Sequence, residues 1–185
     1  DVQIPTWIPA TLITVPTRTL ESTDETYDGP HEGSDLVLTC ADLSSSLSST
    51  DSPWLSALVV RAAPNALEKQ CQNYTGHNPA YMTREAIHWV VEQGVEHLLI
   101  DLPSIDREAD DGLLANHHLF WQVNSEGISE SESTRHSTIT EMIYTPDHAI
   151  DGHYLLQIHA PAFKLDAAPS RPLLFQVERV DFDPS

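Results

Sequence analysis

The amino-acid sequence predicts a mixed α/β domain, with a β-rich mixed sheet and few helices. Short segments rich in β-branched and apolar residues recur along the 185 residues and are separated by turn-forming residues, which is typical of strands. The clearest helical segment follows Thr83 and has the apolar spacing of an amphipathic helix. We expect a single domain over residues 1–185, with about seven strands.

Seven segments carry the strand pattern. The third of them is mostly apolar, which suits a central strand buried on both faces of a sheet. The seven predicted strands are residues 11–15, 36–40, 55–61, 97–101, 138–144, 153–159 and 173–178. Residues 124–137, between the fifth strand and the segment before it, are rich in Ser and Glu and predict a mobile loop.

The predicted helix has signals at both ends. Thr83 can cap its first turn, and Glu85 lies near its positive end. Gly94 lies where a left-handed residue would end the helix. The apolar stripe consists of Ala86, Ile87, Val90 and Val91. A strand follows at residues 97–101, so the segment predicts a βαβ unit.

The charge balance is strongly acidic. Nine Lys and Arg stand against 28 Asp and Glu, which gives a formal net charge of −19. Such a surface repels the phosphates of nucleic acids and anionic membranes. No segment approaches the roughly 18 apolar residues that span a bilayer. We therefore expect no nucleic-acid partner and no membrane partner, and we interpret most of the acidity as solvated surface.

The cysteines indicate the cellular compartment of the protein, and the first residues bear on whether the sequence begins at its natural start. Cys40 and Cys71 lack C-x-x-C spacing, and a chain of this length can build a core without disulfides. Reduced thiols in a cytoplasmic protein are the expectation. Residues 1–5 resemble neither a signal peptide nor a natural start, so we expect further residues upstream.

Several polar residues are candidates for a site in the middle of the chain. Asp101 ends a predicted buried strand, where open α/β sheets place ligand-binding groups, and Ser104 and Asp106 follow it. Alternatively, these aspartates accept backbone N–H bonds and only shape the turn. His77 is likewise either a turn residue or a pocket residue.

His117 and His118 form an adjacent pair before an apolar, aromatic run. Imidazole binds borderline transition metals and acts as a general base near neutral pH. On a helix the two side chains would point about 100° apart, so one can face a site while the other faces packing or solvent. The pair alone therefore leaves a metal ligand, a base and a packing role open.

Glu141 lies within a predicted apolar strand. Strand alternation places it on the same face as Ile139 and Ile143. Burial of an unpaired carboxylate costs several kcal/mol, so this position predicts a partner or a metal, unless the strand is an exposed edge.

Taken together and in this order, these motifs resemble the cyclase family, which includes the bacterial kynurenine formamidases. The resemblance covers residues 53–178 and implies a cyclase-like, swivelling β/β/α domain. The stretches that carry it are residues 76–81, 94–106, 117–121, 138–144, 151–156 and 166–172.

The resemblance implies residue roles. His117 and Glu141 match the late metal ligands of the family, and His118 is the alternative ligand and a candidate catalytic residue. His77, Asp101 and Ser104 are implied to belong to the substrate pocket. The early H-x-G-T-H-x-D ligand motif is absent, because no His precedes His31.

The implied activity is metal-dependent hydrolysis of an amide, such as N-formylkynurenine, by an intact protein with Zn or Mn. A small-molecule substrate and a homo-oligomeric state are implied as well. Since only the late ligands are present, we expect weak or absent metal binding by this chain alone. The alternative is a non-catalytic binding or structural module that has lost the metal motif.

Overall fold

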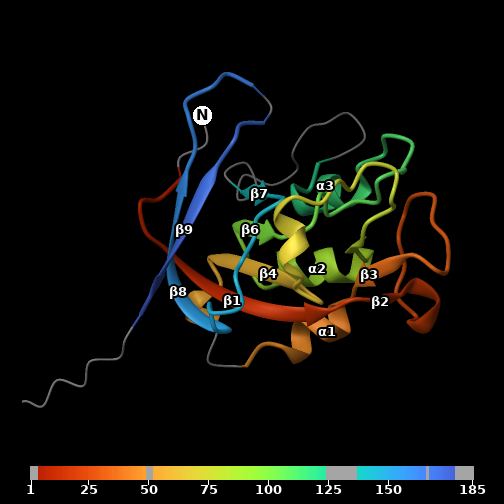
Figure 1. Cartoon of the computed structure of the whole chain (residues 1–185), viewed down its shortest axis with the longest axis horizontal. Helices are drawn as coiled ribbons and strands as arrows, with labels where there is room; N and C mark the ends of the chain where they lie inside the picture. The colour runs from red at the N-terminus through yellow and green to blue at the C-terminus, as the bar shows by residue number, and fades with distance from the viewer. Residues whose placement is uncertain (1–3, 49–51, 124–136, 166, 178–185) are drawn as a thin grey trace, which may run out of the picture.

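Two β-sheets form the frame of the molecule, and helices cover one side of the larger sheet (Figure 1). The computed structural model describes residues 4–48, 52–123, 137–165 and 167–177. Within these ranges the larger sheet has six strands in the order β7-β6-β4-β1-β8-β9. These strands are β1 (Ile8–Pro16), β4 (Ala57–Ala63), β6 (His97–Ile100), β7 (Thr138–Thr140), β8 (Gly152–His159) and β9 (Arg171–Gln176).

The smaller elements surround this sheet. Strands β2 (Arg18–Thr19), β3 (Leu36–Leu38) and β5 (Tyr81–Met82) form a separate three-stranded sheet. The α-helices are α1 (Cys40–Ser45), α2 (Arg84–Glu92) and α3 (Ala115–Phe120). The short 3-10 helices are η1 (Leu20–Ser22), η2 (Ser52–Trp54) and η3 (Leu67–Gln70). None of the helices in the described ranges is long and apolar enough to cross a membrane.

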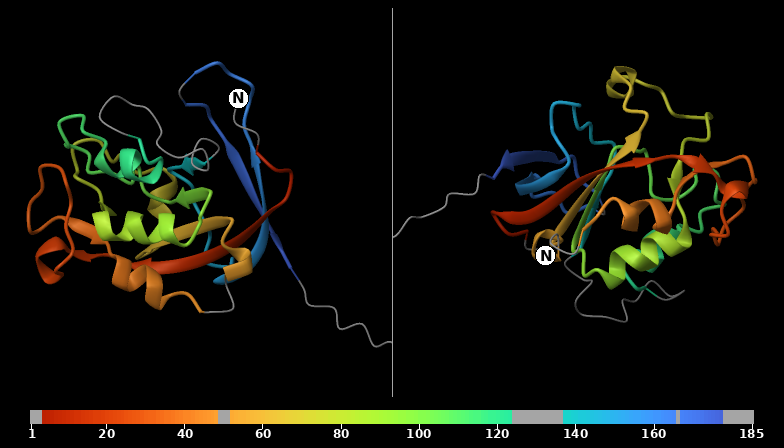
Figure 2. Two further views of the ribbon diagram at one scale, coloured as in Figure 1. Left: turned by 180° about the vertical axis from the view of Figure 1, so that it is seen from behind. Right: turned by 90° about the horizontal axis from the view of Figure 1, so that it is seen from below.

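The strand order explains why the helices lie on one face. Strands β1, β4, β6 and β7 are parallel and follow one another in one direction across the sheet. Right-handed crossovers between such strands place the connecting helices on the same face. Figure 2 shows α1 and α2 together on that face. Their buried side chains, with Phe120 of α3, pack on alternate strand residues such as Leu58 and Val60.

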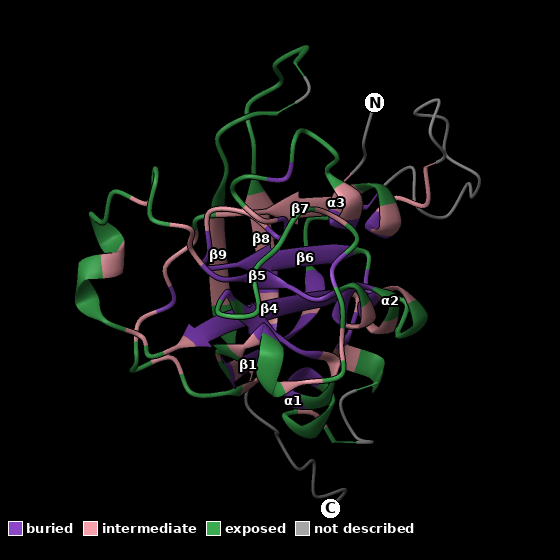
Figure 3. Ribbon diagram, turned by 90° about the vertical axis from the view of Figure 1, so that its right-hand side faces the viewer, coloured by how far each residue is buried: buried purple, intermediate pink, exposed green. Residues whose placement is uncertain are grey.

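The opposite face of the larger sheet is covered differently. Ala57, Val59 and Leu99 of the central strands pack there against Tyr154 and Leu156 of β8. Strands β8 and β9 pair antiparallel and continue the sheet beyond β1 as a projecting hairpin (Figure 1). Figure 3 shows the consequence for burial: the central strands are buried, whereas the outer helix surfaces and the loops are exposed.

Arg61 fastens a loop to this second face. Its buried guanidinium donates to the carbonyl oxygens of Pro146 and Ala149, at 3.0 and 2.9 Å, and to Asp151 Oδ1 at 2.8 Å. Since Arg61 follows Val59 by two residues on β4, its side chain lies on the same face of the strand. The loop from Pro146 to Asp151 is therefore held against the sheet.

Several local predictions are confirmed. Helix α2 begins after Thr83, whose hydroxyl accepts a hydrogen bond from the Ala86 N–H at 3.1 Å. Gly94 follows its end with a φ of +75°. Strand β6 lies where residues 97–101 predicted it, and the mixed, β-rich fold class is confirmed.

Other local predictions are corrected. The strand predicted at residues 36–40 ends at Leu38, because Thr39 caps α1 by accepting the Asp42 N–H. The strand predicted at residues 138–144 is β7, which ends at Thr140. Met142, with a φ of +56°, breaks the extended backbone beyond it. The mobile loop predicted at residues 124–137 lies outside the described residues, except for Ser137.

Candidate functional site

A buried carboxylate organises the start of α3. Leu114 precedes this helix in a left-handed conformation and provides no side-chain cap. Asp106 replaces the cap: its Oδ1 accepts the Asn116 N–H at 2.7 Å, and its Oδ2 accepts the His117 N–H at 3.2 Å. The phenolic hydroxyl of Tyr27 also donates to Oδ1, at 2.9 Å. The carboxylate is thereby satisfied although only 3% of Asp106 is exposed.

The same carboxylate orients the His117 ring. His117 Nδ1 lies 2.6 Å from Asp106 Oδ2, so the hydrogen on Nδ1 points at the carboxylate and Nε2 points away from it. Asn116 locks this geometry from the other side. Its side-chain amide donates to the carbonyl oxygens of Met82 and Ile105, at 2.7 and 2.8 Å, and joins α3 to β5 and to the turn before Asp106.

Glu141 meets the other ring nitrogen. His117 Nε2 lies 3.4 Å from Glu141 Oε1, and the Ile105 N–H donates to that same oxygen at 3.0 Å. The side chains are 15% and 26% exposed, respectively. His117 and Glu141 therefore lie close together, while their role in metal binding stays a prediction.

The surroundings set the charges of this cluster. Burial disfavours a charged His117 imidazole, but hydrogen bonds and the charges of Asp106 and Glu141 outweigh it and raise the pKa of His117 to about 9. Burial would raise the pKa of Asp106, yet hydrogen bonds from His117, Asn116 and Tyr27 lower it. Burial and the Asp106 charge raise the pKa of the Tyr27 phenol.

A cavity of about 990 Å³ opens beside the pair and is lined by both His117 and Glu141. It extends past the edge strand β7 onto the second face of the sheet and is bounded by the β8–β9 hairpin. Trp121 contributes one wall, with its ring centroid 5.4 Å from that of His117, and its indole N–H donates to the Ser137 carbonyl at 3.0 Å. The apolar part of the lining includes Val59, Leu99, Ile143, Ile158 and Leu174.

The face predicted for Glu141 is partly wrong. Ile139 packs against the helix-side core and Ile143 against the core on the second face, so these residues do not share a face. The reason is the end of β7 at Thr140, beyond which strict alternation no longer holds. The two alternatives for Glu141 were an exposed edge strand and a carboxylate with a partner. Strand β7 is an edge strand, and the Glu141 carboxylate has His117 as its partner.

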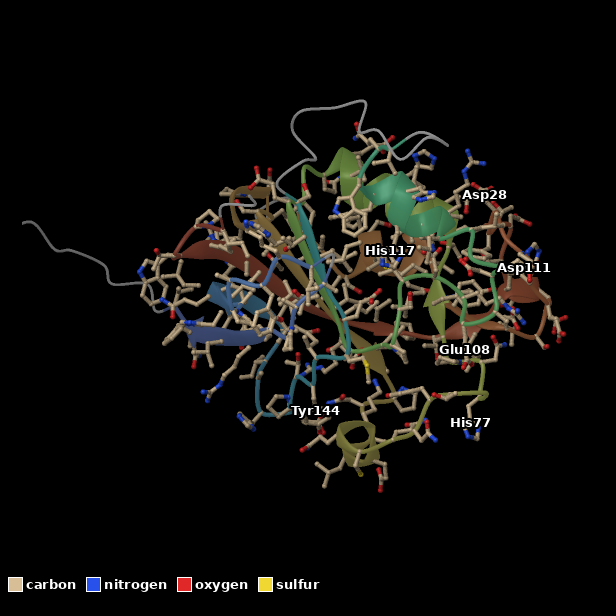
Figure 4. All side chains as sticks on the ribbon, turned by 90° about the horizontal axis from the view of Figure 1, so that it is seen from above. Asp28, His77, Glu108, Asp111, His117 and Tyr144 are labelled. Carbon is tan, nitrogen blue, oxygen red and sulfur yellow. The ribbon has the colours of Figure 1, made fainter. Side chains whose placement is uncertain are left out.

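Two predicted site histidines lie away from this pair. His118 is exposed on α3, as expected when its neighbour faces inward. His77 is exposed in a turn, and Figure 4 shows it at the periphery, well apart from His117. The turn is held outward by Glu108, whose carboxylate accepts the N–H groups of Gly76 and Asn78 at 2.6 and 3.0 Å. The structure therefore does not bring His77 to this cavity, and its place in a substrate pocket stays a prediction.

Asp101 and Ser104 have local partners. Asp101 is buried, accepts the Ala62 N–H at 2.8 Å and pairs with Lys69 Nζ at 2.8 Å. It lines a smaller cavity of about 320 Å³, which Tyr74 and Lys69 also line. Ser104 accepts the Asp106 N–H at 3.0 Å and so supports the turn. A place for either residue in a substrate pocket stays a prediction.

Sequence reasoning missed two contributors, Trp121 and Tyr27, and named Asp106 without its contact to His117. The roles of Asp106 and Trp121 had a weak signal, since each is near His117 in sequence and belongs to a motif of the resemblance. Tyr27 had none, because it lies 79 residues from Asp106 and only the fold joins them.

The donor atoms that face the cavity suit a borderline divalent metal. Two of them lie together, the imidazole nitrogen His117 Nε2 and the carboxylate of Glu141, and His148 also lines the cavity. Within the described ranges, no group of three or more His, Cys, Asp or Glu side chains could hold a metal ion. The two residues therefore make part of a ligand set.

Comparison with known proteins identifies relatives. The Cyclase family model, described as "Putative cyclase", matches residues 4–107, more than half of the chain. This match includes Asp106 but ends before His117 and Glu141. No curated protein matches the chain.

Two solved structures are similar in fold. One, "The Structure Of Potential Metal-Dependent Hydrolase With Cyclase Activity", has 16% identity and a TM-score of 0.56, and the alignment covers 94% of this chain and 67% of that one. The other is a predicted metal-dependent hydrolase from Bacillus stearothermophilus, with 15% identity, a TM-score of 0.54 and coverage of 91% and 63%. The chain thus spans about two thirds of these proteins, and at such identities the likeness concerns the fold.

Proposed function

Since the chain belongs to the Cyclase family, we propose that it forms part of a metal-dependent amide hydrolase in which His117 and Glu141 are two of the metal ligands. The observation that carries this proposal is the convergence of His117 Nε2 and Glu141 Oε1, 3.4 Å apart, on one cavity. The names of the two structural neighbours, both described as metal-dependent hydrolases, support the same class.

The contact behind His117 also supports a metal role. Histidine ligands of metals commonly donate their other ring N–H to a carboxylate, which fixes the tautomer and the ring orientation. Asp106 makes this contact at 2.6 Å and is itself held by Tyr27 and two backbone N–H groups. Glu141 is oriented in a similar way by the Ile105 N–H.

Two ligands are too few for a tightly held catalytic metal, which usually has three protein ligands. We infer that the remaining donors come from outside the described residues. A bound Zn²⁺ or Mn²⁺ would supply Lewis acidity and a water whose pKa is lowered towards about 7. In the chain itself, His117 and Glu141 would hold the ion, and Asp106 would keep His117 Nε2 directed at it.

The cavity favours an aromatic or apolar acyl substrate, of the N-formylkynurenine type. Trp121 offers an aromatic wall beside His117, and Ile143, Ile158 and Leu174 add apolar area. These side chains would bind the body of the substrate and keep water from it, while the hydrolysed amide would face His117 and Glu141.

A non-catalytic binding module is the second candidate. The absence of a third metal-binding side chain from the described part of the molecule favours it. The two candidates predict different outcomes when the native upstream sequence is added. An enzyme gains tight metal binding and amide hydrolysis, whereas a module gains neither.

The test uses cobalt, because Co²⁺ replaces Zn²⁺ and its visible absorption reports bound nitrogen and carboxylate ligands. We expect the chain extended by its native upstream residues to bind Co²⁺ far more tightly than the chain alone. His117→Ala and Glu141→Ala should each weaken binding by at least tenfold in the extended protein.

Exposed histidines supply the controls. His88→Ala on α2 and His118→Ala on α3 both remove an exposed imidazole and should leave the cobalt spectrum unchanged. Loss of binding in His118→Ala with retention in His117→Ala would exchange the ligand assignment. Undiminished binding in both His117→Ala and Glu141→Ala would refute the proposed site.

A further inference from the structure

The large cavity has one lysine or arginine among its described lining residues, Arg171. This residue is the first of β9 and pairs in register with His159, the last residue of β8, at the loop end of the hairpin. It is exposed and therefore lies at the rim of the cavity, where it can meet a ligand that enters. Glu141 lines the same cavity with a side chain of the opposite charge.

Most of the other lysines and arginines in the described ranges form ion pairs with carboxylates. Five of them lie in ion pairs within 4 Å: Arg18, Arg61, Lys69, Arg84 and Arg107. Lys164 and Arg171, both between β8 and the end of β9, form no such pair with a described residue. In a chain with a net charge of −19, a cation left without a carboxylate beside a cavity is unusual.

We propose that Arg171 is the anchor for the carboxylate of an anionic substrate, such as an N-acyl amino acid, in the cavity that holds His117 and Glu141. That the bound anion is a substrate rests on the proposed function. The binding of the anion by Arg171 requires neither a metal nor turnover. A guanidinium presents its donors in a planar fork that matches a carboxylate.

The chemistry of the cavity favours a carboxylate over a phosphate. A phosphate dianion is usually held by several cationic donors, whereas the described lining offers a single Lys or Arg side chain and also contains the carboxylate of Glu141, which repels a dianion more strongly than a monoanion. Attraction is also needed at this point, because the acidic surface repels an anion at longer range. The apolar and aromatic walls would bind the rest of the acyl amino acid.

A matched pair of probes tests this inference: N-acetyl-L-phenylalanine, which carries a carboxylate, and N-acetyl-L-phenylalaninamide, which does not. Binding to the metal-free chain in EDTA is measured by intrinsic fluorescence, with Trp121→Phe identifying the signal of the cavity tryptophan. We expect the carboxylate to bind about tenfold more tightly than the carboxamide at low salt. The difference should shrink as salt screens the pair.

Arg171→Gln should abolish the preference by weakening the carboxylate to the level of the carboxamide. Lys164→Gln removes the other unpaired cation, which does not line the cavity, and should retain the preference. Equal binding of the two probes, a preference that survives Arg171→Gln, or no binding of either probe at millimolar concentration would overturn the inference. Because no metal is present, the result is independent of whether His117 and Glu141 bind one.

Discussion

Asp35 and Asp106 are both buried carboxylates, each 3% exposed, and their positive partners differ. Asp35 accepts a hydrogen bond from Arg107 Nε at 2.7 Å, from a guanidinium that is charged at every accessible pH. Asp106 lies 2.6 Å from Nδ1 of His117, whose charge depends on pH and on ligands. One aspartate therefore has a permanent partner and the other an exchangeable one.

The two networks are otherwise alike. Tyr81 donates to Asp35 at 3.0 Å and Tyr27 donates to Asp106 at 2.9 Å, while the two tyrosine rings pack with centroids 4.8 Å apart. Asn78 completes the first network with a side-chain donor at 2.7 Å. The first network thus ties together residues of three separate segments.

This difference separates a structural pair from a candidate site. Burial would raise the pKa of Asp35, but Arg107 and the other donors lower it to about 2, so the pair stays charged under ordinary conditions. It also lies in no cavity described above. His117, in contrast, keeps Nε2 directed at a cavity and at a second carboxylate, where a proton or another cation can be held.

The largest expected effect comes from breaking the permanent pair. Arg107→Met should lower the free energy of unfolding by about 3–5 kcal/mol, because it leaves Asp35 buried without its counter-charge. Urea unfolding at pH 7 measures the loss. Arg84→Met is the matched control: its pair with Asp28 is about half exposed on both sides and should cost less than about 1 kcal/mol. Similar losses in both variants would remove the distinction.

The second effect is a loss of stability at alkaline pH in the metal-free chain. We expect the free energy of unfolding to fall by about 3 kcal/mol as His117 loses its proton. The pKa of His117 is raised in the folded state, from 6.5 to about 9. Its contribution is therefore fully present below pH 6.5 and is lost as the pH rises through about 9. Urea unfolding in EDTA between pH 6 and 10 measures this decline.

His117→Gln provides the comparison, because glutamine cannot titrate. The variant should be less stable than the parent chain at pH 6, and the difference should narrow towards pH 10. A parent chain whose stability is flat across this range would contradict the assigned charge state of the Asp106–His117 pair.

The sequence predicted the regular part of the fold because local signals and tertiary packing agree there. In α2, the Thr83 cap, the apolar stripe and Gly94 all favour the same helix. Helix α1 was missed although Thr39 and Asp42 have the spacing of a capping pair. The apolar residues before Thr39 extended the predicted strand to residue 40, into the first residue of the helix.

The candidate site was predicted only in part, for a physical reason. His117 and Glu141 were found because an imidazole and a carboxylate within an apolar segment are conspicuous residue types, and the two side chains lie close together. The contacts that orient them depend on chain crossings that periodicity does not encode. Tyr27, for instance, reaches Asp106 from a loop 79 residues earlier. His77 lies away from this pair, in an exposed turn that Glu108 holds through the N–H groups of Gly76 and Asn78.

The smallest and most discriminating effect comes from deleting one hydroxyl in each network. Tyr27→Phe and Tyr81→Phe both keep the packed ring and remove one hydrogen bond to a buried carboxylate, which should cost about 1 kcal/mol of stability. Tyr27→Phe also removes the acceptor of the Arg107 backbone N–H and should cost somewhat more. They should differ at His117. Without the Tyr27 donor, the Asp106 carboxylate is less neutralised and attracts the imidazolium more strongly, so the pKa of His117 should rise further. Tyr81 donates to Asp35, and its loss should leave the pKa of His117 unchanged. An NMR titration of the His117 ring protons in EDTA measures both. An equal shift in the two variants would mean that the neighbouring networks act as one, and the separation of a structural pair from a candidate site would then fail.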